Sequence, residues 1–176
     1  NYSQNNTSLY NSDYFIGRNG TDLKRLASYN QEIAYLSQFF DKQGIILDVG
    51  CSTGEFLVNI AWQGEKYGVE ISEYASKIAI TNGIKLIENI DNVTNKFDVI
   101  VYRGTIQHLP NPFEYIDKSY RSLKPGGFIV FLATPNAISR SPVSVGLFSH
   151  KSNICFAIDE ENILRELVCQ RQITFL

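Results

Sequence analysis

Residues that build metal sites and disulfide frameworks are scarce in this chain of 176 residues. It has two histidines and three cysteines, and Cys51, Cys155 and Cys169 lie too far apart for a zinc motif or a C-x-x-C pair. We therefore expect no bound metal. The odd number of cysteines argues against a disulfide framework, which favours free thiols in a reducing compartment and a cytoplasmic location.

Net charge and long apolar runs are also limited. The formal net charge is −2, whereas a protein that binds duplex nucleic acid normally carries a basic face. No apolar run reaches the roughly 18 residues needed to span a bilayer. We therefore expect neither a nucleic-acid partner nor a membrane partner, while the oligomeric state stays open.

Methionine is absent altogether, so we expect that this chain is not a complete translation product. Its apolar content of 44% and charged content of 19% are typical of a folded domain. The length fits a single domain over residues 1–176. Residues 1–13 are polar and rich in Asn and Ser, so we expect them to form a flexible N-terminal arm.

The apolar residues alternate between strand-like runs and helical spacing along the chain. Strands are expected over 45–49, 67–71, 84–87, 97–102 and 128–133, and helices over 22–40, 54–63, 73–81, 112–123 and 159–170. A turn is expected over 124–127, because this stretch reads Lys-Pro-Gly-Gly. The alternation predicts an α/β fold: a doubly wound, Rossmann-like, mostly parallel sheet flanked by helices.

The most informative motif is the loop that follows the first expected strand, Asp48-Val49-Gly50-Cys51-Ser52-Thr53-Gly54. Its glycines permit a positive φ and a close approach of the backbone to a ligand. The dinucleotide pattern G-x-G-x-x-G fails here at Ser52 and Glu55, and the lysine of a P-loop is missing. Glu70 lies 22 residues after Asp48, which is the usual distance of a carboxylate that binds ribose.

Several motifs in this order resemble class I S-adenosylmethionine-dependent methyltransferases. The resemblance starts with the loop at residues 48–54 and continues through Tyr67–Ser72, Phe97–Val101 with Ile106–Leu109, and Leu123–Gly127. It implies S-adenosylmethionine as cofactor. The cofactor-binding positions that it implies are Asp48, Gly50, Cys51, Ser52, Gly54, Glu70, Ile71, Asn89, Ile90 and Arg103.

The resemblance also implies a role for individual side chains, each with a plain structural alternative. Asp48 would hold the ammonium group of the cofactor or merely cap the loop, and Glu70 would accept hydrogen bonds from the ribose. Asn89 would bind adenine or only form a turn. Arg103 would meet the cofactor carboxylate, bind an anionic substrate, or lie in solvent. His108 would act as a general base, with a structural role in a His-Leu-Pro turn as the favoured alternative.

Two further expectations concern the acceptor and the C-terminal part. Residues 137–153 are expected to lie over the carboxyl ends of the strands and to contribute to an acceptor site. The acceptor is expected to be a small molecule with a sugar or secondary-metabolite hydroxyl. The resemblance implies a C-terminal antiparallel hairpin, which we expect to be incomplete, with its sixth strand beginning at 173–176. The alternative function is an inactive cofactor-binding regulator or partner protein, because Ser52, Asn89 and Gln107 depart from the commoner residues.

Overall fold

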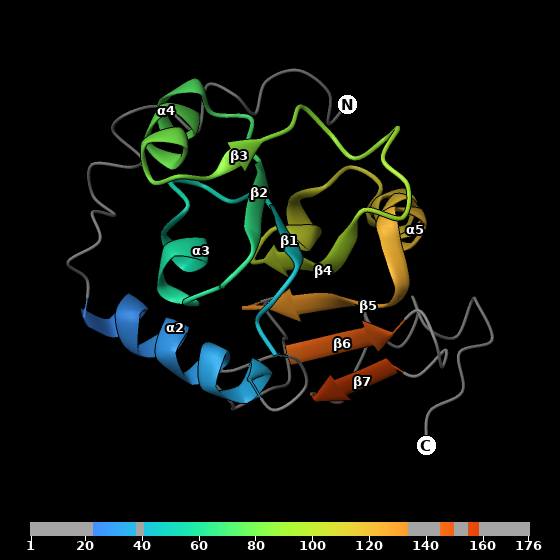
Figure 1. Ribbon diagram of the computed structural model, residues 1–176, viewed down its shortest axis with the longest axis horizontal. Helices are drawn as coiled ribbons and strands as arrows, with labels where there is room; N and C mark the ends of the chain where they lie inside the picture. The colour runs from blue at the N-terminus through green and yellow to red at the C-terminus, as the bar shows by residue number, and fades with distance from the viewer. Residues whose placement is uncertain (1–22, 38–40, 134–144, 150–154, 159–176) are drawn as a thin grey trace.

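The computed structural model describes residues 23–37, 41–133, 145–149 and 155–158 (Figure 1). The strands in this part of the chain form one sheet in the order β3-β2-β1-β4-β5-β6-β7. Their bounds are β1 Ile45–Val49, β2 Glu65–Val69, β3 Lys85–Leu86, β4 Phe97–Arg103, β5 Leu123–Leu132, β6 Val145–Ser149 and β7 Cys155–Ile158. The first five strands are mutually parallel, whereas β6 is antiparallel to β5 and β7 is antiparallel to β6.

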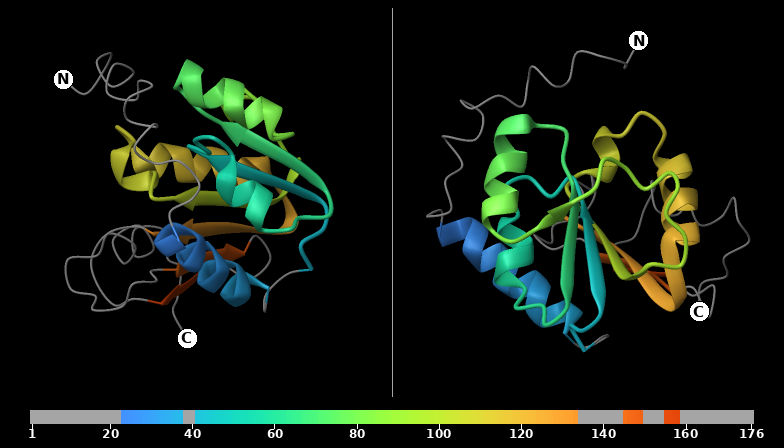
Figure 2. Two further views of the ribbon diagram at one scale, coloured as in Figure 1. Left: turned by 90° about the vertical axis from the view of Figure 1, so that its left-hand side faces the viewer. Right: turned by 45° about the horizontal axis from the view of Figure 1, so that its top comes forward.

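The helices lie on both faces of this sheet, and their bounds are α2 Leu23–Leu36, α3 Glu55–Asn59, α4 Glu73–Thr81 and α5 Pro112–Ser122. Helices α2, α3 and α4 lie on one side of the strands and α5 on the other (Figure 2). Adjacent residues of each strand serve opposite faces: Ile46 packs in the core with α2 and α3, and Leu47 packs in the core with α5. This burial on both faces explains why the strands read as nearly continuous apolar runs.

The strand order reverses at β1: β2 and β3 lie on one side of it, and β4 and the later strands lie on the other. Strand β1 pairs with β2 on one side and with β4 on the other, with Asp48 opposite Gly68 and Val101. The crevice outside the carboxyl ends of the strands at such a switch point is where ligands bind in open α/β sheets. The predicted doubly wound α/β architecture is therefore confirmed, and it indicates where to look for a site.

Local capping explains where two of the helices begin. Ser72 accepts a hydrogen bond from the Ala75 N–H at 3.4 Å at the start of α4, and Asn111 accepts one from the Glu114 N–H at 3.4 Å at the start of α5. Pro112 occupies the first turn of α5, where its missing N–H costs nothing.

Some predicted boundaries are wrong. Helix α3 ends at Asn59 rather than 63, because Ala61 adopts a positive φ of 52° and diverts the chain. The turn expected over 124–127 is part of β5, which begins at Leu123 and has an irregular register against β4.

The C-terminal expectations need correction too. Within the segment 137–153, residues 145–149 form β6 along the edge of β5 and do not lie over the carboxyl ends; Phe128 pairs with Ser149 and Leu132 with Val145. The sixth strand thus comes earlier than 173–176, and β6 with β7 already makes an antiparallel hairpin. The expected arm 1–13, the helix 159–170, the strand 173–176 and the rest of 137–153 lie outside the described residues. No helix among the described residues is long and apolar enough to cross a membrane.

Candidate functional site

A cavity of about 610 Å³ opens at the carboxyl ends of β1, β2 and β4. Its walls come from the loop between β1 and α3, the first residues after β2 and β4, the side of α2, and the start of α5. Of the predicted site residues, eight line this cavity: Asp48, Gly50, Cys51, Ser52, Glu70, Ile71, Arg103 and His108. Gly54, Asn89 and Ile90 are not part of its lining.

The loop after β1 has the backbone conformation that its glycines suggested. Gly50 and Gly54 have φ values of 80° and 79°, and Ser52 between them has a φ of 54°. A Cβ at Gly50 would lie 2.5 Å from Thr105 Oγ1, so a side chain would both strain the backbone and collide with the segment after β4. Ser52 sits in the left-handed region without the freedom of glycine and is strained. Gly54 is the residue directly before α3, and it lies outside the cavity lining.

Asp48 is almost completely buried, with 2% of its surface exposed. Its Oδ1 atom accepts no hydrogen bond from any residue in the described part of the chain, although Asp48 lines the cavity. Burial raises the pKa of this carboxyl to about 7; the neighbouring Arg103 lowers it, while Glu70 and Glu32 raise it further. A buried acceptor without a donor costs free energy, so a cationic donor entering the cavity would relieve this cost.

Glu70, directly after β2, is fixed by backbone donors. Its Oε2 accepts the Ser52 N–H at 2.9 Å and its Oε1 accepts the Ser72 N–H at 2.7 Å. A carboxylate offers about four acceptor positions, so each oxygen keeps capacity for a ligand hydroxyl. Ile71, the next residue, lines the cavity and has 59% of its surface exposed. This apolar surface suits the ring of a nucleobase.

Arg103 is the last residue of β4 and is bound by α2. Its Nε donates to Glu32 Oε2 at 2.7 Å, and its Nη2 donates to Glu32 Oε1 at 3.1 Å and to Ser28 Oγ at 3.3 Å. The guanidinium carbon lies 4.4 Å from the centroid of the Tyr29 ring. Arg103 is therefore neither a solvated surface residue nor freely mobile.

Sequence reasoning missed the partners that α2 supplies. The Tyr29 hydroxyl donates to Glu55 Oε2 at 3.1 Å, and Arg25 Nη1 lies 3.4 Å from the same oxygen. Burial raises the pKa of Tyr29 to about 12, so its hydroxyl keeps its proton. One signal was available: Glu32 is a carboxylate inside the apolar stripe of the expected helix, and its exposure is only 1%.

His108 lies at the end of the short 3-10 helix η1, Ile106–His108. Its exposed side chain lines the cavity, and its Nε2 lies 3.4 Å from Gln107 Nε2. The His108 backbone N–H donates to the Thr105 carbonyl at 2.9 Å, so the histidine takes part in the turn. It thus combines a local structural contact with access to the cavity.

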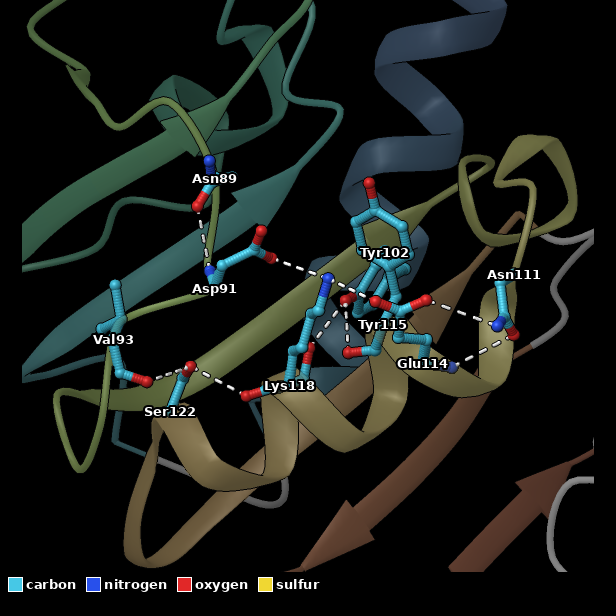
Figure 3. Close-up of polar contacts among 10 residues, drawn as sticks. Asn89, Asp91, Val93, Tyr102, Asn111, Glu114, Tyr115, Lys118 and Ser122 are labelled. Atoms are coloured by element: carbon cyan, nitrogen blue, oxygen red, sulfur yellow. Dashed lines mark hydrogen bonds and ion pairs between the residues drawn. The ribbon is translucent and has the colours of Figure 1, made fainter. Parts of the chain in front are cut away.

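Asn89 and Ile90 lie in the connection between β3 and β4. Asn89 is exposed, and its Oδ1 accepts the Asp91 N–H at 3.0 Å. This contact is the one expected if Asn89 only forms a turn. Asp91 in turn pairs with Lys118 of α5 at 2.8 Å (Figure 3). The Ile90 side chain is buried in the core beneath α5, so only its backbone is available to a ligand. No cluster of metal-binding side chains occurs in the described ranges.

The fold and the cavity define a class: a doubly wound α/β protein with a nucleoside-type binding loop at the switch point of its sheet. Residues 21–163 match the family model described as a methyltransferase domain. The chain belongs to this family.

Two curated relatives match part of this chain. An uncharacterized protein of Methanocaldococcus jannaschii is 34% identical over 108 residues, which is 58% of this chain and 50% of that protein. The ubiquinone biosynthesis O-methyltransferase of Alkalilimnicola ehrlichii is 27% identical, over 56% of this chain and 43% of the enzyme. The chain therefore spans about half the length of the curated relatives that it matches, or less.

Solved structures show the same fold. A Thermotoga maritima protein described as a SAM-dependent methyltransferase, possibly a histamine N-methyltransferase, is 28% identical with a TM-score of 0.52; the match covers 61% of this chain and 52% of that chain. A Geobacter sulfurreducens SAM-dependent methyltransferase in complex with S-adenosyl-L-homocysteine is 21% identical with a TM-score of 0.51, over 60% of this chain and 47% of that chain. The second likeness concerns the fold alone.

Proposed function

We propose that this chain binds S-adenosylmethionine and transfers its methyl group to a small-molecule acceptor. The observation that carries the proposal is the buried Asp48 carboxylate, which lines the cavity and whose Oδ1 has no hydrogen-bond donor among the described residues. The family membership and the position of Glu70 beside the same cavity support it.

The residues fit this cofactor. Asp48 would accept a hydrogen bond from its ammonium group, Glu70 would accept from the ribose hydroxyls, and Ile71 would pack on the base. Gly50 lines the cavity, and its missing side chain makes room for Thr105, because a Cβ there would lie 2.5 Å from Thr105 Oγ1. When bound, S-adenosylmethionine supplies an electrophilic methyl group that passes to the acceptor as the carbon–sulfur bond breaks and its electron pair stays on sulfur. Positioning is the main contribution that the protein makes to such a displacement.

For the acceptor we propose a hydroxyl group of a small or carrier-bound molecule, such as a sugar or a secondary metabolite. Two relatives support oxygen as the methylated atom: the ubiquinone biosynthesis O-methyltransferase and a malonyl-acyl-carrier-protein O-methyltransferase of Calditerrivibrio nitroreducens, which is 30% identical over 49% of this chain and 36% of the enzyme. His108, at the cavity wall, is the candidate base that takes the hydroxyl proton.

A second candidate is a protein that binds the cofactor without turnover. The strained Ser52, the turn-forming Asn89 and the absence of a carboxylate at Gln107 favour it. The fold alone does not decide, since a fold can host unrelated chemistry, and a cyclase 21% identical to this chain shares the architecture with a TM-score of 0.51.

Calorimetric titration with S-adenosylmethionine and S-adenosylhomocysteine tests binding, and a panel of hydroxyl, amine and carbon acceptors with a methyl-labelled cofactor tests transfer. Binding and label transfer to a hydroxyl acceptor support the first proposal. Binding with no transfer to any acceptor class supports the second candidate. If neither S-adenosylmethionine nor S-adenosylhomocysteine binds, both candidate functions are contradicted.

A further inference from the structure

The wall that η1 and α5 give to the cavity differs in chemistry from the rest of the lining. From this segment, His108, Leu109 and Tyr115 line the cavity. They offer one imidazole, one aliphatic side chain and one aromatic ring. His108 is exposed, while Leu109 and Tyr115 are half-buried, so a molecule from solvent can reach this wall.

The carboxylates that line the cavity come from other elements and already have partners or tasks. Glu55, at the start of α3, accepts the Tyr29 hydroxyl at 3.1 Å and pairs with Arg25 at 3.4 Å. Asp48 and Glu70 are the groups that the proposed function assigns to the cofactor. No Asn or Gln side chain belongs to the lining among the described residues. A sugar, which needs several directional hydrogen-bond partners, therefore finds few of them at the η1 and α5 wall.

An aromatic hydroxyl compound suits this wall better than a sugar does. Its ring has apolar faces that can pack on Leu109 and on the ring of Tyr115, and its hydroxyl needs one polar partner, which His108 provides. Tyr115 is held in place within α5. Its carbonyl oxygen accepts the Tyr102 hydroxyl at 3.3 Å, and the Lys118 Nζ lies 5.4 Å from the centroid of its ring (Figure 3).

The acidity of the hydroxyl favours the same class of acceptor. A free imidazole titrates near about pH 6.5 and a phenol near about pH 10. An aliphatic hydroxyl is far less acidic and lies closer to water, whose pKa is about 15.7. A phenol is thus the hydroxyl that an imidazole base deprotonates against the smaller free-energy difference.

We propose that the acceptor is a phenol, packed on Leu109 and Tyr115, with His108 taking its proton. This inference rests on the proposed function and narrows the acceptor named there. The phenol oxygen forms the new bond to the methyl carbon as the carbon–sulfur bond breaks and its electron pair stays on sulfur. The phenolic proton moves to the imidazole and from there to solvent, because His108 is exposed.

Calorimetry on the chain saturated with S-adenosylhomocysteine tests the acceptor class without turnover. Catechol should bind more tightly than methyl glucoside. Tyr115→Leu should weaken catechol binding by about 2- to 12-fold, the range that an aromatic pair contributes, and should leave the affinity for S-adenosylhomocysteine unchanged. Tyr120→Leu is the matched control, because Tyr120 lies on α5 but outside the cavity lining; it should bind catechol like the wild type.

Transfer from a methyl-labelled cofactor tests the role of His108. The kcat/KM for catechol should exceed that for methyl glucoside by at least about 100-fold, the lower end of what a general base contributes. His108→Gln should lower transfer to catechol by a similar factor, with folding checked by circular dichroism. It should lower transfer to 4-nitrocatechol much less, because this acceptor ionises near neutral pH without help from a base.

Three results would overturn the inference. They are a preference for methyl glucoside over catechol, an equal loss with both catechols in His108→Gln, and a loss of affinity for S-adenosylhomocysteine rather than for catechol in Tyr115→Leu. Catechol that neither binds nor reacts would overturn it as well. Each of these leaves cofactor binding by the wild type intact, whereas a wild-type chain that does not bind S-adenosylhomocysteine overturns the proposed function too.

Discussion

At the scale of single residues, the protonation of Asp48 should control ligand affinity. Burial raises the pKa of this carboxyl to about 7, whereas binding of an ammonium group requires the ionised form. Below this pH, binding must first expel a proton. Affinity for S-adenosylhomocysteine should therefore rise about tenfold between pH 6 and pH 8 and then level off, as measured by calorimetry at each pH.

Asp48→Asn provides the control, because it keeps the shape but does not ionise. It should bind more weakly, without a rise in affinity across this pH range. The sign for stability is opposite: a folded-state pKa raised above the unfolded value gives stability that is present at low pH and lost as pH rises through about 7. The unliganded wild type should lose stability from pH 4 to pH 8 relative to Asp48→Asn. Parallel stability curves for the two proteins would contradict the assignment.

Ser52 should be a site of stored backbone strain. With a φ of 54°, it occupies a region that glycine adopts without steric cost. Ser52→Gly should raise the free energy of unfolding by about 0.5 to 1 kcal/mol, because relief of strain outweighs the extra entropy that glycine gains in the unfolded chain. Denaturant unfolding measures the change. Thr53→Gly, at a neighbour without positive φ, should destabilise instead; a loss at both positions would show that Ser52 is not strained.

At the scale of elements, helix α5 should fasten the connection between β3 and β4. Ser122 is fully buried, and its Oγ lies 2.7 Å from the Val93 carbonyl oxygen and 2.8 Å from that of Lys118 (Figure 3). Ser122→Ala leaves the Val93 carbonyl without this donor, so we expect a loss of about 1 kcal/mol in the free energy of unfolding.

Thr81→Ala is the matched comparison for Ser122→Ala. Thr81 also donates to a carbonyl four residues earlier, at 3.0 Å, but it is exposed on α4. Its loss should change the free energy of unfolding by no more than about 0.5 kcal/mol. Equal losses in the two variants, measured by denaturant unfolding, would show that the contact with Val93 does not stabilise the connection.

The elements were predictable to the extent that local pattern determines them. The apolar runs of the buried parallel strands predict these strands, and Ser72 and Asn111 mark where two helices begin. The end of α3 depends on the positive φ of Ala61, for which alanine gives no signal. The place of residues 145–149 depends on pairing with β5, which is a non-local contact.

At the scale of the whole molecule, the positions of the main site residues followed from the sequence, but their contacts did not. Asp48, Gly50 and Glu70 were recognisable by spacing, because the motif lies on one strand, one loop and the next strand. The partner of Arg103 is Glu32, 71 residues away in the chain, and only the packing of α2 against the sheet brings them together. Asn89 matched a family position, yet its side chain bonds to its own turn.

The same packing predicts how the molecule should respond to a ligand. The cavity joins the ends of β1, β2 and β4 to α2, so a ligand that contacts all of them binds only the folded chain. S-adenosylhomocysteine at 100 times its Kd should raise the free energy of unfolding by about 2.7 kcal/mol. Hydrogen exchange should slow most at residues 50–54, 70–72 and 103–105. NAD is the comparison ligand, because the loop lacks the dinucleotide spacing and should gain no protection from it. Equal stabilisation by NAD would mean that the cavity recognises an adenine nucleoside alone, and that the pairing of Asp48 with an amino acid group plays no part.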